Sequence, residues 1–128
     1  MCILSISASE AMNRLLQFVL QNKYDIVCLP DVFNGMRVVR SANNVGLVIV
    51  DIDLAEKENF DFIEYIKGSR MHKKPLIILT SEQSSESLFT GDKDLYVFKK
   101  PFDPVILSSK VDEIINFGVF TKNTLENF

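Results

Sequence analysis

Short, unbroken apolar runs alternate along the chain with longer segments whose apolar residues recur every three to four positions. Unbroken runs are typical of strands buried on both faces of a parallel sheet, whereas the wider spacing is typical of amphipathic helices. The pattern predicts five strands, over residues 3–6, 25–29, 46–51, 75–79 and 95–98. It predicts helices over residues 8–21, from 31, around 62–66 and from 103, with at most a brief helix within 81–90.

Helix start signals support three of these helices. Ser7 is predicted to cap the first helix, and Glu10 three residues later completes a capping box. Asp31 is predicted to cap the second helix. Asp103 is predicted to cap the last helix, with Pro104 at its first position.

Apolar spacing also predicts which helix faces are buried. The second helix and the last helix present these apolar positions: Phe33, Met36 and Val39, then Leu107, Val111, Ile114 and Ile115. Gly118 is predicted to end the last helix. The predicted organisation is therefore one domain over residues 1–118, followed by a C-terminal tail over residues 119–128.

Strands that alternate with amphipathic helices predict a parallel sheet covered on both faces. Right-handed crossovers leave few ways to order such strands. We therefore predict an α/β fold of the flavodoxin-like type, a doubly wound five-stranded parallel sheet with five strand–helix units. A length of 128 residues is sufficient for one domain with a sizeable core.

Composition excludes several function classes. The net charge of −3 gives no basic footprint for nucleic acid. No apolar run approaches the roughly 20 residues that cross a bilayer, and the N-terminus lacks the pattern of a signal peptide. The two cysteines, Cys2 and Cys28, form no disulfide framework and no metal-ligand spacing. We expect a cytoplasmic protein with neither nucleic acid nor a membrane as its partner.

Three polar side chains with complementary chemistry close three of the predicted strands. Asp51 ends the third strand, Thr80 the fourth, and Lys100 follows the fifth. Open α/β sheets place their chemistry at the carboxyl ends of their strands. The sequence therefore predicts a site that contains an acid, a hydroxyl and an ammonium group.

From residue 3 to about residue 117, the order of elements and these strand ends resemble the receiver domains of bacterial two-component response regulators. The resemblance implies that Asp51 is the phosphoacceptor and that Thr80 contacts the phosphoryl group. It implies that Lys100, which precedes Pro101, pairs with the phosphoaspartate. Residues 60–67 fall in register on the third helix of that family.

One departure from the family falls at its metal site. Receivers carry two acidic residues after the first strand that hold Mg²⁺, and Ser7 and Ala8 stand at those positions. Asp51 and Asp53 are the remaining candidates for carboxylate ligands. Because phosphoryl transfer to a carboxylate brings two anions together, it normally needs a metal. We expect weak Mg²⁺ binding, slow or absent phosphorylation and no cofactor, as in an atypical pseudo-receiver.

Two residues keep alternative interpretations. Asp53 is either a surface acid on a charged loop or a carboxylate that reaches the site. Asp51 is either an acid satisfied by Lys100 in a structural ion pair or an aspartate that is still phosphorylated. Ser7 is accounted for as a helix cap without a catalytic role.

The predicted function is a signalling module that binds other proteins and is not an enzyme. By resemblance, its partners would be a histidine kinase or a downstream effector, with a homodimer as a further alternative. The implied partner surface includes Tyr96, Val97 and Ile106. Two other functions stay open: a phosphorylatable receiver in which Asp53 aids the metal, and, more remotely, a phosphatase of the haloacid dehalogenase type that uses the pair Asp51 and Asp53.

Overall fold

The computed structural model describes residues 1–41, 44–53, 56–81 and 94–126, apart from the side chains of Glu56 and of residues 117–126. The described strands are β1 (Cys2–Ile6), β2 (Asp25–Leu29), β3 (Val45–Asp51), β4 (Leu76–Thr80) and β5 (Leu95–Lys99). The described helices are α1 (Glu10–Leu20), α2 (Val32–Ser41), α3 (Glu56–Gly68) and α4 (Pro104–Glu126). Most of the segment over residues 81–90, where a brief helix was predicted, lies outside the described residues.

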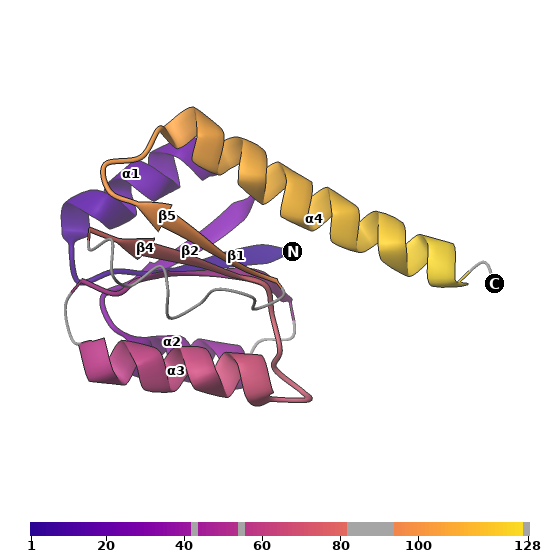
Figure 1. Ribbon diagram of the computed structural model, residues 1–128, viewed down its shortest axis with the longest axis horizontal. Helices are drawn as coiled ribbons and strands as arrows, with labels where there is room; N and C mark the ends of the chain where they lie inside the picture. Colours follow the sequence, from indigo (N-terminus) through magenta and orange to yellow (C-terminus); the bar gives the residue numbers. More distant parts are fainter. Residues whose placement is uncertain (42–43, 54–55, 82–93, 127–128) are drawn as a thin grey trace.

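The strands form one parallel sheet in the order β2-β1-β3-β4-β5. Helices α1 and α4 cover one face of the sheet, and α2 and α3 cover the other (Figure 1). This arrangement confirms the predicted flavodoxin-like fold, in which β1 and β3 lie side by side at the centre.

Each face of the sheet carries its own apolar core. Successive residues of a strand point to opposite faces, so Leu47 and Ile49 of β3 pack under α1 and α4, whereas Val48 and Val50 pack against α2 and α3. The helices supply the other half of each core: Leu16, Leu20, Leu107 and Val111 on one side, and Val39, Phe62, Ile63 and Ile66 on the other. Each fully buried side chain of this size stabilises the fold by about 1.5–3 kcal/mol.

Helix α1 begins two residues later than predicted, and its cap is a different serine. The Oγ atom of Ser9 accepts a hydrogen bond of 3.2 Å from the backbone N–H of Met12. The prediction that Ser7 caps this helix was therefore wrong. Ser7 stays outside the helix, at the end of β1, where its side chain is free to make a different contact.

Helix α2 confirms its predicted cap but not all of its predicted buried face. Asp31 accepts a hydrogen bond of 2.9 Å from the backbone N–H of Asn34. Val39 is buried and Met36 packs against the core. Phe33 is 77% exposed, so its assignment to the buried face was wrong. Val32, the preceding residue, packs against the core instead, and one step along a helix of 3.6 residues per turn rotates Phe33 away from that face.

Helix α4 begins as predicted but ends later. Asp103 accepts a hydrogen bond of 2.8 Å from the backbone N–H of Val105, which confirms the cap. The helix passes through Gly118 and continues to Glu126, so the predicted end was wrong. A glycine inside a helix costs only about 1 kcal/mol relative to alanine. The far end of α4 extends beyond the sheet (Figure 1). The division into a domain and a tail stays a prediction.

None of the helices in the described part of the chain combines the length and apolar character needed to cross a membrane.

Candidate functional site

The site lies at the carboxyl edge of the sheet, where the ends of β3, β4 and β5 meet. The Nζ atom of Lys100 lies 2.7 Å from Oδ1 of Asp51. The backbone N–H of Lys100 donates a hydrogen bond of 2.8 Å to the carbonyl oxygen of Thr80. Thr80 is buried directly beside this contact. The structure thus brings the three predicted residues together, and their chemical roles stay predictions.

Ser7 joins this group from the end of β1. Its hydroxyl donates a hydrogen bond of 2.6 Å to Oδ2 of Asp51 and accepts one of 3.0 Å from the backbone N–H of Ser9. Ser7 is 2% exposed and Asp51 is 6% exposed. Ala8, the second residue at the expected acidic pair, supplies no polar side chain. Ser7 is thus part of the site and does not cap the helix, and its lack of a catalytic role stays a prediction.

Asp53 also lies within the site. Its Oδ2 atom is 2.8 Å from Nζ of Lys100, and its Oδ1 atom accepts a hydrogen bond of 2.9 Å from the backbone N–H of Ser81. Its own N–H donates a hydrogen bond of 3.2 Å to Oδ1 of Asp51. Asp53 is an exposed residue, and these contacts favour the second interpretation, a carboxylate that reaches the site.

These contacts form a continuous chain of polar groups. It runs from Ser7 through Asp51, Lys100 and Asp53 to Ser81. The chain connects the ends of β1, β3, β5 and β4, in that order. In this chain the carboxylates of Asp51 and Asp53 share the ammonium group of Lys100.

The ion pairs change the pKa values of two members of this chain. Burial raises the pKa of Asp53. Its hydrogen bonds to Lys100 and Ser81, together with the ammonium charge, lower that pKa by a larger amount, so it lies below the ordinary value of 3.8. Burial lowers the pKa of Lys100, but the contacts to Asp51 and Asp53 outweigh that effect and raise it above 10.5. Both changes favour the charged forms of the pair.

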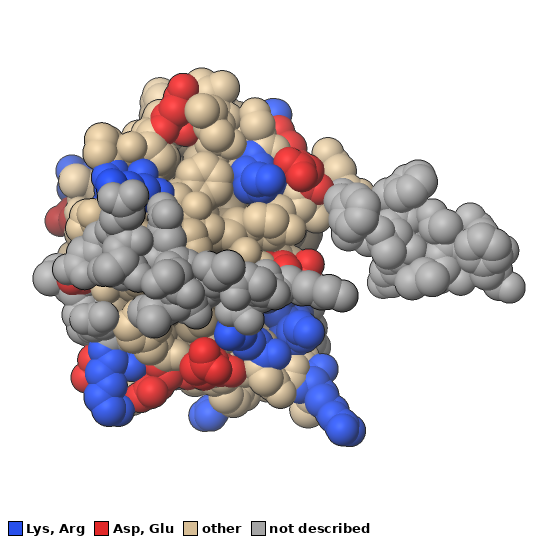
Figure 2. All heavy atoms as spheres, viewed as in Figure 1, with Lys and Arg blue, Asp and Glu red and all other residues tan. Residues whose placement is uncertain are grey.

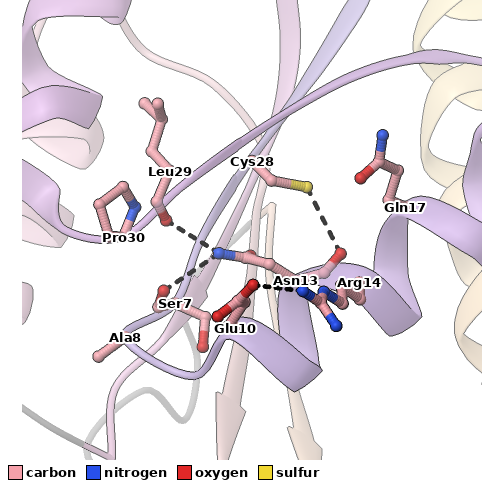
Figure 3. Close-up of a pocket in the computed structure, with 9 residues that line it drawn as sticks. All are labelled: Ser7, Ala8, Glu10, Asn13, Arg14, Gln17, Cys28, Leu29 and Pro30. Atoms are coloured by element: carbon pink, nitrogen blue, oxygen red, sulfur yellow. Dashed lines mark hydrogen bonds and ion pairs between the residues drawn. The ribbon is translucent and has the colours of Figure 1, made fainter.

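Asn13 holds the loop that carries Ser7, a role with no signal in the sequence pattern. Its Nδ2 atom donates hydrogen bonds of 3.1 Å to the carbonyl oxygens of Ser7 and Leu29 (Figure 3). Its Oδ1 atom accepts a hydrogen bond of 2.9 Å from Ser5. These bonds tie α1 to the ends of β1 and β2. Beside them lies an open pocket of about 520 Å³.

A smaller pocket of about 290 Å³ reaches Asp51 from the side of α2 and α3. Its walls include Ala8, Phe33 and Glu58. Asn59 also lines this pocket, and its side chain donates a hydrogen bond of 3.4 Å to the carbonyl oxygen of Asp51. The pocket therefore borders the site at Asp51.

Within the described part of the chain, no group of three or more His, Cys, Asp or Glu residues could hold a metal ion.

Acidic and basic side chains are mixed over the face shown in Figure 2. Along α3 they form pairs, such as Lys57 with Asp61 at 2.9 Å and Lys67 with Glu64 at 3.5 Å.

The three residues of the predicted partner surface do not share one face. Ile106 is 59% exposed near the start of α4, beside the exposed Val105. Tyr96 is half-buried on the same side of the sheet, with Nζ of Lys110 5.1 Å from its ring centre. Val97 packs on the opposite side, with the core under α2 and α3. Successive residues of a strand point to opposite faces of the sheet, so Val97 points away from Tyr96 and from the side on which α4 lies.

Searches with the sequence match no family model and no curated protein. Solved receiver structures match the fold closely. The chemotaxis response regulator CheY4 of Vibrio cholerae has a TM-score of 0.74 and 20% identity, with 88% of this chain and 97% of that chain covered. The receiver domain of an HD domain-containing protein from Pseudomonas fluorescens Pf-5 has a TM-score of 0.77 and 19% identity, with 91% and 94% covered.

A third match is the beryllofluoride-activated DrrB receiver domain, with a TM-score of 0.71 and 22% identity over 90% of this chain and 97% of that chain. The shared strand order and the near-complete coverage define a protein with the receiver fold.

Proposed function

We propose that this chain is a receiver-like signalling module that acts by binding other proteins, with weak or no Mg²⁺-dependent phosphorylation at Asp51. The observation that carries the proposal is the hydrogen bond from Ser7 to Asp51. Ser7 occupies one oxygen of the carboxylate and Lys100 occupies the other. Because buried carboxylates need hydrogen-bonding partners, these two contacts satisfy Asp51 without an added ion.

The donor set around Asp51 fits Mg²⁺ poorly. Mg²⁺ prefers near-octahedral oxygen ligands and is usually bound through one or two carboxylates, substrate phosphates and water. Here the carboxylates of Asp51 and Asp53 already share the ammonium group of Lys100, and the hydroxyl of Ser7 is directed at Asp51. Ala8 offers no ligand. An ion would have to compete with Lys100 for one oxygen of each carboxylate and with Ser7 for the other oxygen of Asp51.

The receiver fold supports protein partners of the two-component type. One of the similar structures is a chemotaxis response regulator, and others are receiver domains of signalling proteins. We propose that a histidine kinase or a downstream effector is the partner, and that the exposed start of α4 around Ile106 contributes to the contact.

Intact mass spectrometry tests the proposal. The protein is incubated with Mg²⁺ and a small acyl phosphate, and the mass is measured with an Asp51→Asn variant in parallel. We expect no phosphoryl adduct on the wild-type chain. An adduct that forms on the wild type and disappears in Asp51→Asn would show that the site still accepts phosphate.

The position of Asp53 supports a second candidate function, that of a phosphorylatable receiver. Its carboxylate lies beside Asp51 and is joined to it through Lys100, so both candidate carboxylates are present at the site. If Asp53 aids a metal, the wild type forms the adduct and Asp53→Asn loses it. If the wild type forms the adduct and Asp53→Asn keeps it, the site is phosphorylated without help from Asp53.

A further inference from the structure

Basic side chains gather at the amino edge of the sheet, opposite the edge that carries Asp51. Residues 32–50 contain two arginines and no acidic residue, and residues 65–75 contain four basic residues, one histidine and no acidic residue. Figure 2 shows basic side chains grouped at the lower right, over the end of α3. We call this set the basic surface; its members are Arg37 and Arg40 of α2, Lys67 of α3, and Arg70, Lys73 and Lys74 of the segment between α3 and β4.

Three contacts join α2, α3 and the segment that follows α3. The Cζ atom of Arg40 lies 5.5 Å from the ring centre of Tyr65. The hydroxyl of Tyr65 lies 2.9 Å from Nδ1 of His72. The backbone N–H of His72 donates a hydrogen bond of 2.9 Å to the hydroxyl of Ser69. These contacts place the basic residues after α3 beside the end of α2, so the basic surface is continuous across the three elements.

Four of the six basic side chains have no carboxylate partner. Arg37, Arg70 and Lys73 are exposed, and Lys74 is partly buried. None of these four forms an ion pair with a carboxylate in the described part of the chain. Their concentration stands against a net charge of −3 for the whole chain. The amino edge therefore presents a positive potential to solvent.

Helix ends account for the other two members of the basic surface. Arg40 and Lys67 lie in the last turns of α2 and α3, where the helix dipole favours positive charge. Lys67 also pairs with Glu64 at 3.5 Å. The three basic residues that follow α3 belong to no helix, and the dipole does not account for them.

Apolar groups lie among these charges. Met71, in the middle of the basic segment after α3, is 83% exposed. On α2, Arg37 and Arg40 border an open hollow of about 490 Å³ whose lining includes Leu29 and Val38. Methionine and arginine are enriched at protein–protein interfaces relative to the rest of the surface. The combination of charge and apolar contact area therefore suits a protein partner.

We propose that the basic surface binds a short acidic segment of a partner protein. Carboxylates of that segment pair with the guanidinium and ammonium groups, and an apolar side chain packs against Met71. The inference rests on the proposed function, in which the chain acts by binding other proteins. It adds a second contact surface, at the edge of the sheet opposite Asp51 and away from the start of α4.

The surroundings of the basic surface favour a short segment over an extended anionic surface. A membrane or a nucleic acid presents phosphates over a wide area. Such an area would also meet the acidic side chains nearby on α3, Asp61 and Glu64, which are 68% and 71% exposed. A short peptide contacts the basic groups alone and avoids this repulsion.

A peptide titration followed by two-dimensional ¹H–¹⁵N NMR tests the proposal. The probe is a ten-residue peptide in which glutamate alternates with glycine, with leucine in place of one central glycine. We expect saturable shifts at Arg37, at Arg40 and over residues 70–74, and their loss at high salt, where exposed charges are screened. The same peptide with glutamine in place of each glutamate should cause no saturable shift.

Two combined variants separate the basic surface from general charge attraction. Simultaneous Gln substitution after α3 should weaken binding about tenfold, because several exposed charge contacts are lost together; the changes are Arg70→Gln, Lys73→Gln and Lys74→Gln. The matched control removes three positive charges from other positions and should bind within about twofold of the wild type; its changes are Arg14→Gln, Lys57→Gln and Lys110→Gln. Met71→Ser keeps every charge and should weaken binding about threefold.

Three results would overturn the proposal. They are the absence of a saturable shift, shifts that centre on the start of α4 around Ile106, and equal weakening in the two combined variants. Tighter binding of phosphatidylglycerol vesicles or of a ten-nucleotide single-stranded DNA than of the peptide would also overturn it, in favour of a membrane or a nucleic acid. A phosphoryl adduct in the mass measurement above would contradict the proposed function, whereas a failed peptide titration would remove only this second surface.

Discussion

The hydroxyl of Ser7 lies 2.6 Å from Oδ2 of Asp51, although the two residues are 44 positions apart in the sequence. The contact connects the end of β1 to the end of β3, the two central strands of the sheet. Both residues are almost completely buried. A buried carboxylate that loses a donor is left with an unsatisfied oxygen, so this one contact contributes to the stability of the fold.

Ser7→Ala should destabilise the fold by about 1–3 kcal/mol, because it leaves one oxygen of a buried carboxylate without its donor. The measurement is urea unfolding at neutral pH. Ser41→Ala is the matched control, since Ser41 is exposed and bonds only to its own helix, at the carbonyl oxygen of Arg37. A loss for Ser7→Ala no larger than that for Ser41→Ala would show that the hydrogen bond has no net effect.

Ser7→Asp should create dependence on Mg²⁺. A second carboxylate against Asp51 adds like-charge repulsion, so the variant should be less stable than the wild type when divalent ions are chelated. Mg²⁺ binds the folded state through the new carboxylate pair and should raise the midpoint of thermal unfolding. The wild type and the uncharged control Ser7→Asn should show no such rise. A wild type that is stabilised equally would contradict the argument that the native donor set fits Mg²⁺ poorly.

Asp53→Asn should make the free energy of unfolding depend less on pH in the acid range. The pKa of Asp53 is lower in the folded state than its ordinary value of 3.8, so the group stabilises the fold above that pH. This contribution disappears as the pH falls through the folded-state pKa, when the unfolded chain already holds the proton. The wild type should therefore be more stable than Asp53→Asn at neutral pH, and the difference should shrink in acid.

Urea unfolding over a series of pH values measures this difference. Asp61→Asn controls for the change in net charge, because it removes a carboxylate from an exposed pair on α3. A difference between the wild type and Asp53→Asn that stays constant from neutral to acid pH would mean that Asp53 is not held by Lys100 in solution.

The neighbouring residues Ile106 and Leu107 should respond oppositely to truncation. Leu107 is fully buried on the inner face of α4, so Leu107→Ala should lower the free energy of unfolding by about 2–5 kcal/mol. Ile106 is 59% exposed, so Ile106→Ala should change the free energy of unfolding by less than about 0.5 kcal/mol. Denaturant unfolding of the two variants separates these outcomes. Similar losses would mean that Ile106 is packed and not available as a contact surface.

The sequence predicted the position of the site because of a simple property of parallel sheets. Their strands run in the same direction, so Asp51, Thr80 and Lys100 had to meet at one edge once the strands were recognised. The unbroken apolar run of β3 made that recognition direct. The pairing of Lys100 with Asp51 follows from the same geometry, since opposite charges at one edge come within reach.

The contacts of Ser7 and Asp53 were harder to predict, because they depend on loops. Ser7 and Ser9 both precede α1, and Glu10 follows Ser7 at the spacing of a capping box, so the local signal favoured the wrong serine. Asp53 lies just after β3, where the chain leaves the sheet. Residues i and i+2 of an extended chain share a side, and this was the one signal that pointed Asp53 towards Lys100.

The contacts at the sheet edge hold its two outer ends differently. The loop after β1 is joined to them by the hydrogen bond of Ser7, whereas the end of β4 is joined to them by the bond from Ser81 to Asp53 and by the bond from the N–H of Lys100 to the carbonyl oxygen of Thr80. In the middle, Asp51 and Asp53 are joined twice, through Lys100 and through the N–H of Asp53. Loss of the Ser7 hydrogen bond would therefore separate the loop after β1 from Asp51 and leave the contacts among Asp51, Lys100, Asp53 and the end of β4 in place.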